Sequence, residues 1–212
     1  MKKIRAIEFF FLYIVVPLLL FFFREQLKAQ MGGGSFVILF LPIIAPLLVT
    51  ILLREKTIQW CELWSVANFK YHFIQILKIF LPFSLVITIA TYYFFSDLFL
   101  ILPKMSIGLW IIVMLFYPLL SVLPQGIIYR VFFYKRYAMI FKQTNLLWIS
   151  ALSFCFCHIF FNNIYALIFT FLGGFLFSFR YEKTNSWLIS SLEHAMYGNL
   201  LFTIGLGTFL VS

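Results

Sequence analysis

The segment Ile107–Leu123 decides the fold: it reads IGLWIIVMLFYPLLSVL and contains no charged residue. A helix needs about 20 mostly apolar residues to cross the hydrocarbon core of a bilayer. Six further apolar segments are spread along the chain, namely Ile7–Phe23, Phe36–Leu53, Phe73–Phe94, Leu146–Phe161, Ile164–Phe179 and Trp187–Leu210. The sequence therefore predicts an all-α, polytopic membrane helix bundle with about seven transmembrane helices.

Composition supports a membrane environment. Apolar residues make up 64% of the chain and charged residues only 11%, whereas soluble domains usually carry about 25% charged residues. The net charge of +9 does not indicate nucleic-acid binding, because the basic residues separate apolar runs and form no patch on a polar fold. Their expected partners are anionic lipid headgroups. The sequence carries no signal for an oligomeric state.

The distribution of basic residues predicts the orientation. If the N-terminus is cytoplasmic and the spans alternate, 12 of the 16 basic residues are inside, three are outside, and Lys78 lies within a span. The three outside residues are Arg24, Lys28 and Lys104. Because translocation of Lys and Arg is disfavoured, we expect a cytoplasmic N-terminus in a multi-pass protein of the cell (inner) membrane.

Several connecting segments interrupt the spans. Residues 31–35 (Met-Gly-Gly-Gly-Ser) are typical of a turn, and Thr57–Lys70 indicates a short interfacial helix. Pro124 is expected to break or kink the chain, and Gln125–Phe141 to form a further helical segment. We expect one membrane domain over residues 1–212, with N-terminal spans in 1–106 and a core that carries the polar motifs in 107–210.

Polar side chains within apolar runs are costly in a membrane and often mark functional sites. In the first such segment, Gly126 and Arg130 lie four residues apart on one helix face, with Gln125 beside them. Arg130 has two interpretations. It either extends to the cytoplasmic headgroups or belongs to a buried site.

The second and third polar segments contain histidines. His158 follows Phe154 by four residues, and it either makes a helix–helix hydrogen bond or serves a site. Glu193 and His194 lie together in the last span, and Asn199 follows five residues later. Small residues around them also fit a helix-packing face. Two histidines and a carboxylate in a dry cavity can bind a divalent metal or orient a water.

The two histidines differ in their expected depth. Measured along ideal helices, His158 lies about 18 Å from the cytoplasmic end of its span and His194 about 11 Å from the end of its own. The two side chains meet only if the helices tilt or begin at different heights.

The order of these three segments resembles the CPBP intramembrane metalloproteases, which include the CAAX prenyl endopeptidases. That family has Glu-Glu-x-x-x-Arg, Phe-x-x-x-His and His-x-x-x-Asn blocks. Residues Gln125–Arg130 are similar to the first, Phe154–His158 match the second, and His194–Asn199 are similar to the third with one extra residue. The bacterial branch, in which bacteriocin-processing-like proteins fall, adds a Pro-Gln start and a Glu-His-x-x-Tyr-Gly-Asn end, and both fit this chain.

The resemblance implies a helical membrane fold around a cavity that is open to the cytoplasmic side, and hydrolysis of a peptide bond. It implies that His158 and His194 bind a divalent metal, expected to be zinc, or stabilise the oxyanion. It further implies that Asn199 is an oxyanion donor and that Arg130 orients the site.

The chain departs from the family at the first block. In the family a Glu of this block activates water, whereas here the two positions are Gln125 and Gly126. An amide cannot act as a general base at neutral pH, and loss of such a base commonly costs a factor of about 10²–10⁴. Glu193 is the remaining intramembrane carboxylate in this half of the sequence. It could support His194 from behind or take over as the base.

Three functions follow from the sequence. The first is a membrane-embedded metallo-endopeptidase that cleaves a membrane-associated peptide or protein near the cytoplasmic face. The second is a catalytically impaired relative that binds a peptide or a partner protein in the same cavity. The third is a small transporter or channel, which is disfavoured because the sequence shows no internal repeat.

Overall fold

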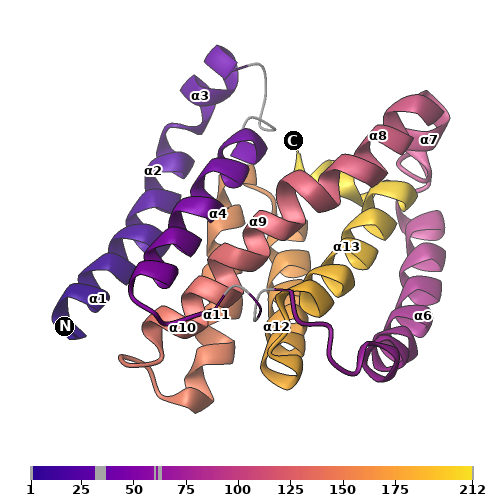
Figure 1. Ribbon diagram of the computed structural model, residues 1–212. Helices are drawn as coiled ribbons and strands as arrows, with labels where there is room; N and C mark the ends of the chain where they lie inside the picture. Colours follow the sequence, from indigo (N-terminus) through magenta and orange to yellow (C-terminus); the bar gives the residue numbers. More distant parts are fainter. Residues whose placement is uncertain (1, 32–36, 60, 62–63, 212) are drawn as a thin grey trace.

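The computed structural model describes residues 2–31, 37–59, 61 and 64–211, and over these residues the secondary structure is helical, with no strand. Figure 1 shows a bundle in which long helices run side by side, with the N-terminus at one end and the described C-terminal residues near the other. The predicted all-α membrane helix bundle is thereby confirmed. The predicted turn at residues 31–35 lies almost wholly outside the described residues.

The first half of the chain forms an N-terminal helix, its return helix and one long peripheral helix. Its elements are α1 Lys2–Phe10, the π-helical turn η1 Phe11–Val15, α2 Val16–Phe22, α3 Arg24–Met31, α4 Val37–Arg54, α6 Phe69–Phe94 and α7 Ile101–Met105. The second half comprises α8 Ile107–Tyr117, η3 Pro118–Val122, α9 Leu123–Gly126, η4 Ile127–Phe132, α10 Phe133–Tyr137, α11 Gln143–Cys157, η5 His158–Phe161, α12 Ile164–Thr184, α13 Trp187–Ile204 and η6 Leu206–Leu210.

Five described helices are long and apolar enough to cross a membrane: Lys2–Phe22, Phe69–Phe94, Ile107–Tyr137, Gln143–Phe161 and Ile164–Thr184. Phe40–Arg54 is a shorter apolar helix, and α13 covers the seventh predicted span. Each predicted span therefore coincides with a helix, although the count of seven crossings is not confirmed.

Of the two effects expected at Pro124, the break is wrong, and the kink stays a prediction. Elements α8 to α10 form one continuous helix from Ile107 to Tyr137, which is about 46 Å long at 1.5 Å per residue. A proline inside a helix removes a hydrogen bond and crowds the preceding turn. Here a π-helical turn, η3, directly precedes the short α-helical segment that holds Pro124, and its wider hydrogen-bonding pattern accommodates the ring. Residues 125–137 are thus the continuation of the fourth span.

The predicted interfacial helix at Thr57–Lys70 stays a prediction, because Cys61 is helical but its neighbours in the middle of the segment are not described. Trp60, Glu62 and Leu63 lie outside the described residues. Residues 57–59 and 64–68 form turns and irregular structure, and α6 begins only at Phe69.

The bundle has two distinct ends. We call the near end the one where α1 contacts α10, and the far end the one where α2, η5 and η6 meet. The near half contains an aromatic core, in which Tyr13, Phe132, Phe133 and Tyr137 are buried against one another. At its rim Glu8 accepts hydrogen bonds from Arg136 and Tyr137, which attaches the N-terminal helix to α10.

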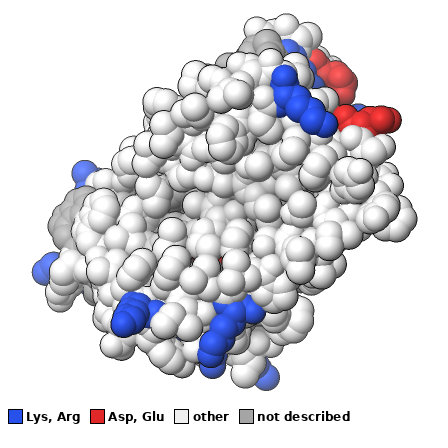
Figure 2. Space-filling view, turned by 90° about the vertical axis from the view of Figure 1, so that its right-hand side faces the viewer, with Lys and Arg blue, Asp and Glu red and all other residues white. Residues whose placement is uncertain are grey.

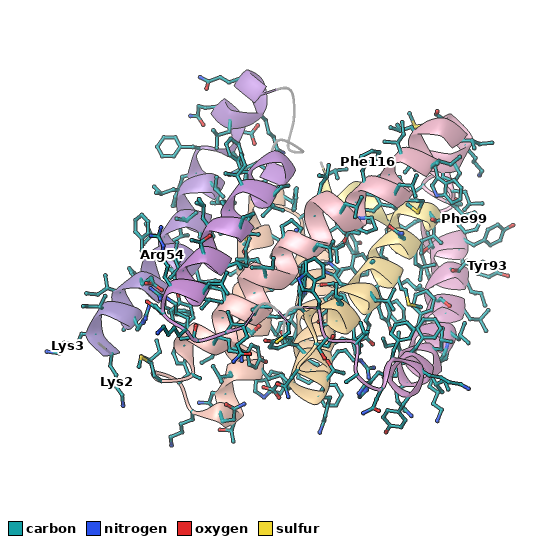
Figure 3. All side chains as sticks on the ribbon, viewed as in Figure 1. Lys2, Lys3, Arg54, Tyr93, Phe99 and Phe116 are labelled. Carbon is teal, nitrogen blue, oxygen red and sulfur yellow. The ribbon has the colours of Figure 1, made fainter. Side chains whose placement is uncertain are left out.

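The outer surface is suited to lipid. On the face drawn in Figure 2, a wide uncharged band separates basic side chains along the left and lower edges from a mixed acidic and basic group at the upper right. Figure 3 shows Lys2, Lys3 and Arg54 on the near side, while Tyr93 and Phe116 project outward on the other. Such large exposed apolar side chains are stable in a bilayer and not in water.

Candidate active site

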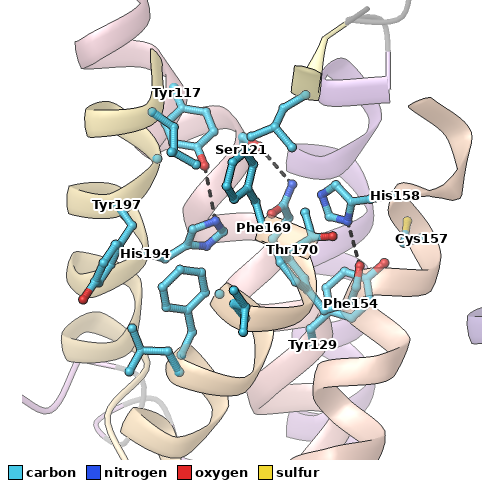
Figure 4. A pocket seen from close by; sticks show the side chains of 18 of the residues that line it. Tyr117, Ser121, Tyr129, Phe154, Cys157, His158, Phe169, Thr170, His194 and Tyr197 are labelled. Carbon is cyan, nitrogen blue, oxygen red and sulfur yellow. Dashed lines mark hydrogen bonds between the residues drawn. The ribbon is translucent and has the colours of Figure 1, made fainter. Parts of the chain in front are cut away.

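A cavity of about 380 Å³ lies among the helices of the far half. Most of its lining is aromatic or aliphatic, and it receives side chains from every long helix of the bundle. Its lining side chains with polar groups are Tyr117, Ser121, Gln125, Tyr129, Cys157, His158, Thr170, His194 and Tyr197. Figure 4 shows most of them around the cavity. The structure thus brings together three of the six predicted site residues: Gln125, His158 and His194.

His158 stands where α11 ends and the 3₁₀ turn η5 begins. Its Nδ1 lies 2.7 Å from the carbonyl oxygen of Phe154. A carbonyl only accepts hydrogen bonds, so Nδ1 carries the proton and Nε2 keeps its lone pair. His158 therefore offers the cavity a hydrogen-bond acceptor or a ligand atom.

His194 lies in the middle of α13 and is 5% exposed. Its Nε2 is 3.2 Å from the hydroxyl of Tyr117 on α8, and its ring stacks on Phe177 with the centroids 4.3 Å apart. The ring is held in place from two sides, and its Nδ1 is buried without a partner among the described residues.

The two histidines meet at Phe154. The ring centroid of Phe154 lies 4.7 Å from that of His158 and 5.6 Å from that of His194. The difference in their expected depths does not separate them, because both line the same cavity (Figure 4). Gln125 completes the group, and its amide nitrogen donates to the Ser121 hydroxyl at 3.0 Å.

Arg130 does not reach the lipid headgroups, so that interpretation is wrong. It is only 1% exposed, and its guanidinium carbon lies 5.6 and 5.3 Å from the ring centroids of Phe154 and Phe177. No nitrogen of the guanidinium has a hydrogen-bond partner among the described residues. Arg130 therefore lies behind two rings that line the cavity, and cation–π contacts stabilise its charge.

Glu193 is fully buried and bound to another residue. Arg180 on α12 donates to both of its carboxylate oxygens, at 2.8 and 3.1 Å. The sequence places Arg180 in a cytoplasmic segment, yet the structure buries it at this ion pair. Glu193 is not among the residues that line the cavity. This two-point geometry makes it a structural partner of Arg180.

Asn199 faces a different neighbour. Its amide nitrogen donates to the carbonyl oxygen of Met114 on α8 at 3.2 Å, and it does not line the cavity. Its amide oxygen has no partner among the described residues. The role of oxyanion donor stays a prediction.

Gly126 is a point of close approach between α9 and α13. A Cβ atom at this position would lie 2.6 Å from both the Ser191 hydroxyl and the Trp187 indole nitrogen. Trp187 is fixed there, because its indole N–H donates to the carbonyl oxygen of Leu123 at 3.0 Å and its ring packs against Trp64. The position that holds a Glu in the bacterial branch of the family has no room here even for a methyl group unless these neighbours move.

The donor atoms do not match a catalytic zinc site. Such sites usually have three protein ligands besides water. Over the described residues, no group of three or more His, Cys, Asp or Glu could hold a metal ion. The cavity lining includes the two histidines and Cys157, but no described Asp or Glu. Zinc at His158 and His194 stays a prediction that this structure does not test.

Sequence reasoning missed four residues around the site: Tyr117, Ser121, Trp187 and Arg180. One signal was available, because Tyr117, Ser121 and Gln125 are spaced by four residues and so share a helix face. The contact of Trp187 with Gly126 had no comparable signal, since it depends on how α9 packs on α13.

By its fold and its site, this protein is a multi-spanning membrane helix bundle with a histidine-lined cavity between the helices. Within it, residues 106–200 match the family described as "Type II CAAX prenyl endopeptidase Rce1-like". The match confirms the family resemblance that the three motif blocks indicate, and this is a family of CAAX-type intramembrane proteases. No curated protein and no solved structure matches the chain.

Proposed function

We propose that this protein binds a membrane-associated peptide in the cavity of a CAAX-protease fold and hydrolyses it poorly or not at all. One observation carries the proposal: no carboxylate among the described residues lines the cavity that holds the two histidines. The two histidines line the cavity, while no described carboxylate is placed there to activate water.

Two routes to a replacement base are blocked. At the original position, Gly126 is enclosed by Trp187 and Ser191. Glu193, the alternative, gives both of its oxygens to Arg180. Freeing its carboxylate would leave Arg180 unpaired in the interior, and breaking a buried ion pair costs about 3–5 kcal/mol. Restoring a base would therefore require changes in the packing around Gly126 or Glu193, and not only the substitution of one side chain.

The cavity remains suitable for binding. Its volume of about 380 Å³ lies within the range of ligand sites. Apolar walls with a few polar groups are typical of such sites. Gln125, His158 and His194 supply those groups, and they can pair with the amides of a peptide backbone.

A second candidate is the metallo-endopeptidase, and the family match favours it. The free Nε2 of His158 also favours it, because an imidazole can itself serve as a general base. In that case the protein cleaves a membrane-associated substrate, and the metal question turns on whether a third ligand comes from beyond the described residues.

The test compares the wild-type protein with His194→Ala, both purified in detergent. Each is incubated with a membrane-spanning Leu–Ala peptide, and products are followed by mass spectrometry while bound metal is measured on the same samples. We expect the peptide to remain intact at the same level in both samples. Cleavage by the wild-type protein that disappears in His194→Ala would establish the endopeptidase instead.

A binding measurement completes the test. We expect the wild-type protein to retain the intact peptide, and Gly173→Phe, which adds a large ring to the cavity wall, to retain less. Equal retention by both proteins would place the peptide elsewhere and contradict the proposal. Gly108→Ala on α8 is the matched control, because a Cβ there meets no atom closer than 3.8 Å.

A further inference from the structure

The residues that line the cavity do not cover the whole length of the bundle. Its lining includes Leu20 near the end of α2, Phe160 and Phe161 in η5, and Leu210 and Val211 at and beyond η6. These elements meet at the far end. None of its lining residues belongs to α1 or α10, and on α12 none lies beyond Phe177. The cavity therefore extends from the middle of the bundle toward the far end.

Packed side chains close the near side of the cavity. Tyr129 on η4 lines it, and the next residues along that helix, Arg130, Val131 and Phe132, are each about 1% exposed. Beyond them Phe133 and Tyr137 continue the aromatic core to α10. A ligand that approached from the near end would have to displace this core.

Charge distinguishes the two ends as well. The described basic side chains at the near end belong to α1, the end of α4, the start of α6, α10, the end of α12 and the segments next to them, and they include Lys2, Lys3, Arg54 and Arg136. At the far end the described basic residues are Arg24, Lys28 and Lys104. The end with more Lys and Arg is cytoplasmic by the positive-inside rule, so the far end faces away from the cytoplasm.

We propose that the cavity receives an apolar peptide segment from the non-cytoplasmic side of the membrane. This direction is opposite to the cytoplasmic location that the sequence led us to expect for the cleavage site. The nature of the occupant rests on the proposed function. The direction of access rests on the cavity and on the charges alone.

The polar groups favour a peptide over a lipid acyl chain. The Nε2 of His158 and the carbonyl oxygen of Gln125 belong to residues that line the cavity, and neither has a hydrogen-bond partner among the described residues. An acyl chain would leave these groups without partners, and an unpaired buried polar group costs about 1–3 kcal/mol. Backbone amides can satisfy them.

Two native cysteines provide a matched pair of reporters. Cys157 lines the cavity, and Cys61 is exposed in the segment between α4 and α6, which belongs to the near end. The variant C61S/C155S retains only Cys157, and C155S/C157S retains only Cys61. Each is treated with a membrane-impermeant, positively charged methanethiosulfonate, in intact cells and in inside-out vesicles.

We expect Cys157 to react in intact cells and Cys61 only in inside-out vesicles. Reaction of Cys157 only in inside-out vesicles would overturn the direction of access, and so would its failure to react from either side. Reaction of Cys61 in intact cells would overturn the orientation and the proposal with it. None of these results depends on whether the protein cleaves peptides, so the proposed function can fail while this inference stands.

The occupant is tested with the Cys157 variant in liposomes. A Leu–Ala peptide in the bilayer is expected to slow labelling of Cys157 at least fivefold, whereas the same concentration of oleate leaves the rate within twofold. Q125M keeps a similar side-chain length but removes the amide, and it is expected to weaken the protection by the peptide. Protection by oleate as strong as that by the peptide would identify an acyl chain and refute the peptide.

Discussion

The near and far halves of this bundle use the same helices in opposite ways. The near half is filled, with an aromatic core, the Arg180–Glu193 pair and the Glu8–Arg136 contact. The far half encloses a cavity lined by His158 and His194. The boundary passes through the motifs themselves, because the histidines face the cavity while Arg130 and Glu193 lie in the packing behind it. A motif can thus keep its residues and still divide them between structure and site.

The first way to break the filled half is Glu193→Gln. It would leave the buried Arg180 without its carboxylate, and removing one partner of a buried pair costs about 3–5 kcal/mol. We expect a large fall in thermal stability, measured by scanning fluorimetry in detergent. The double variant Arg180→Met/Glu193→Leu is the control and is expected to recover most of the loss. Wild-type stability in Glu193→Gln would show that the pair is not essential to packing.

The second prediction concerns the close contact of Gly126 with Trp187 and Ser191, at the position where the family has a Glu. Gly126→Glu alone is expected to destabilise the protein, because its Cβ would collide with Trp187 and Ser191 and overpacking costs about 1–3 kcal/mol. Trp187→Leu/Ser191→Ala in the same chain makes room, so the triple variant is expected to be more stable than the sum of its changes predicts. Full additivity would mean that the three residues do not share this space.

The third prediction contrasts the two buried arginines. Arg180 has a carboxylate partner, whereas Arg130 has no hydrogen-bond partner among the described residues. Burying a charge carries a desolvation cost, which is why replacing a whole buried ion pair by apolar residues of similar volume is often neutral or stabilising. We expect Arg130→Met to leave thermal stability unchanged or higher and Arg180→Met to lower it. A loss of equal size in both variants would reveal a partner of Arg130 beyond the described residues.

The smallest effect is expected at the rim of the near end. Glu55 bridges Arg5 and Arg136 but remains partly exposed, and pairs of this kind contribute about 0.2–1 kcal/mol each. Glu55→Gln should lower the midpoint of thermal unfolding by a small amount that shrinks as salt is added. A salt-independent loss would mean that the carboxylate acts through packing.

The sequence predicted the helices well, because long apolar runs have one stable form in lipid. It also predicted that Gln125, His158 and His194 converge, since three motif blocks in order constrain the fold. The sequence could not place Arg180 against Glu193, because a basic residue at the end of an apolar run is expected to lie in the connecting loop. The break expected at Pro124 failed because a π-helical turn accommodates the ring.

The central claim is that none of the described carboxylates serves the histidine pair. The most direct measurement is the rate at which Gly126→Glu/Trp187→Leu/Ser191→Ala and the wild-type protein cleave the same Leu–Ala peptide, determined by mass spectrometry. A general base is worth a factor of about 10²–10⁴, so we predict no cleavage above background by the wild-type protein and measurable cleavage by the variant. Wild-type cleavage at least as fast as that of the variant, and abolished by His194→Ala, would contradict the account.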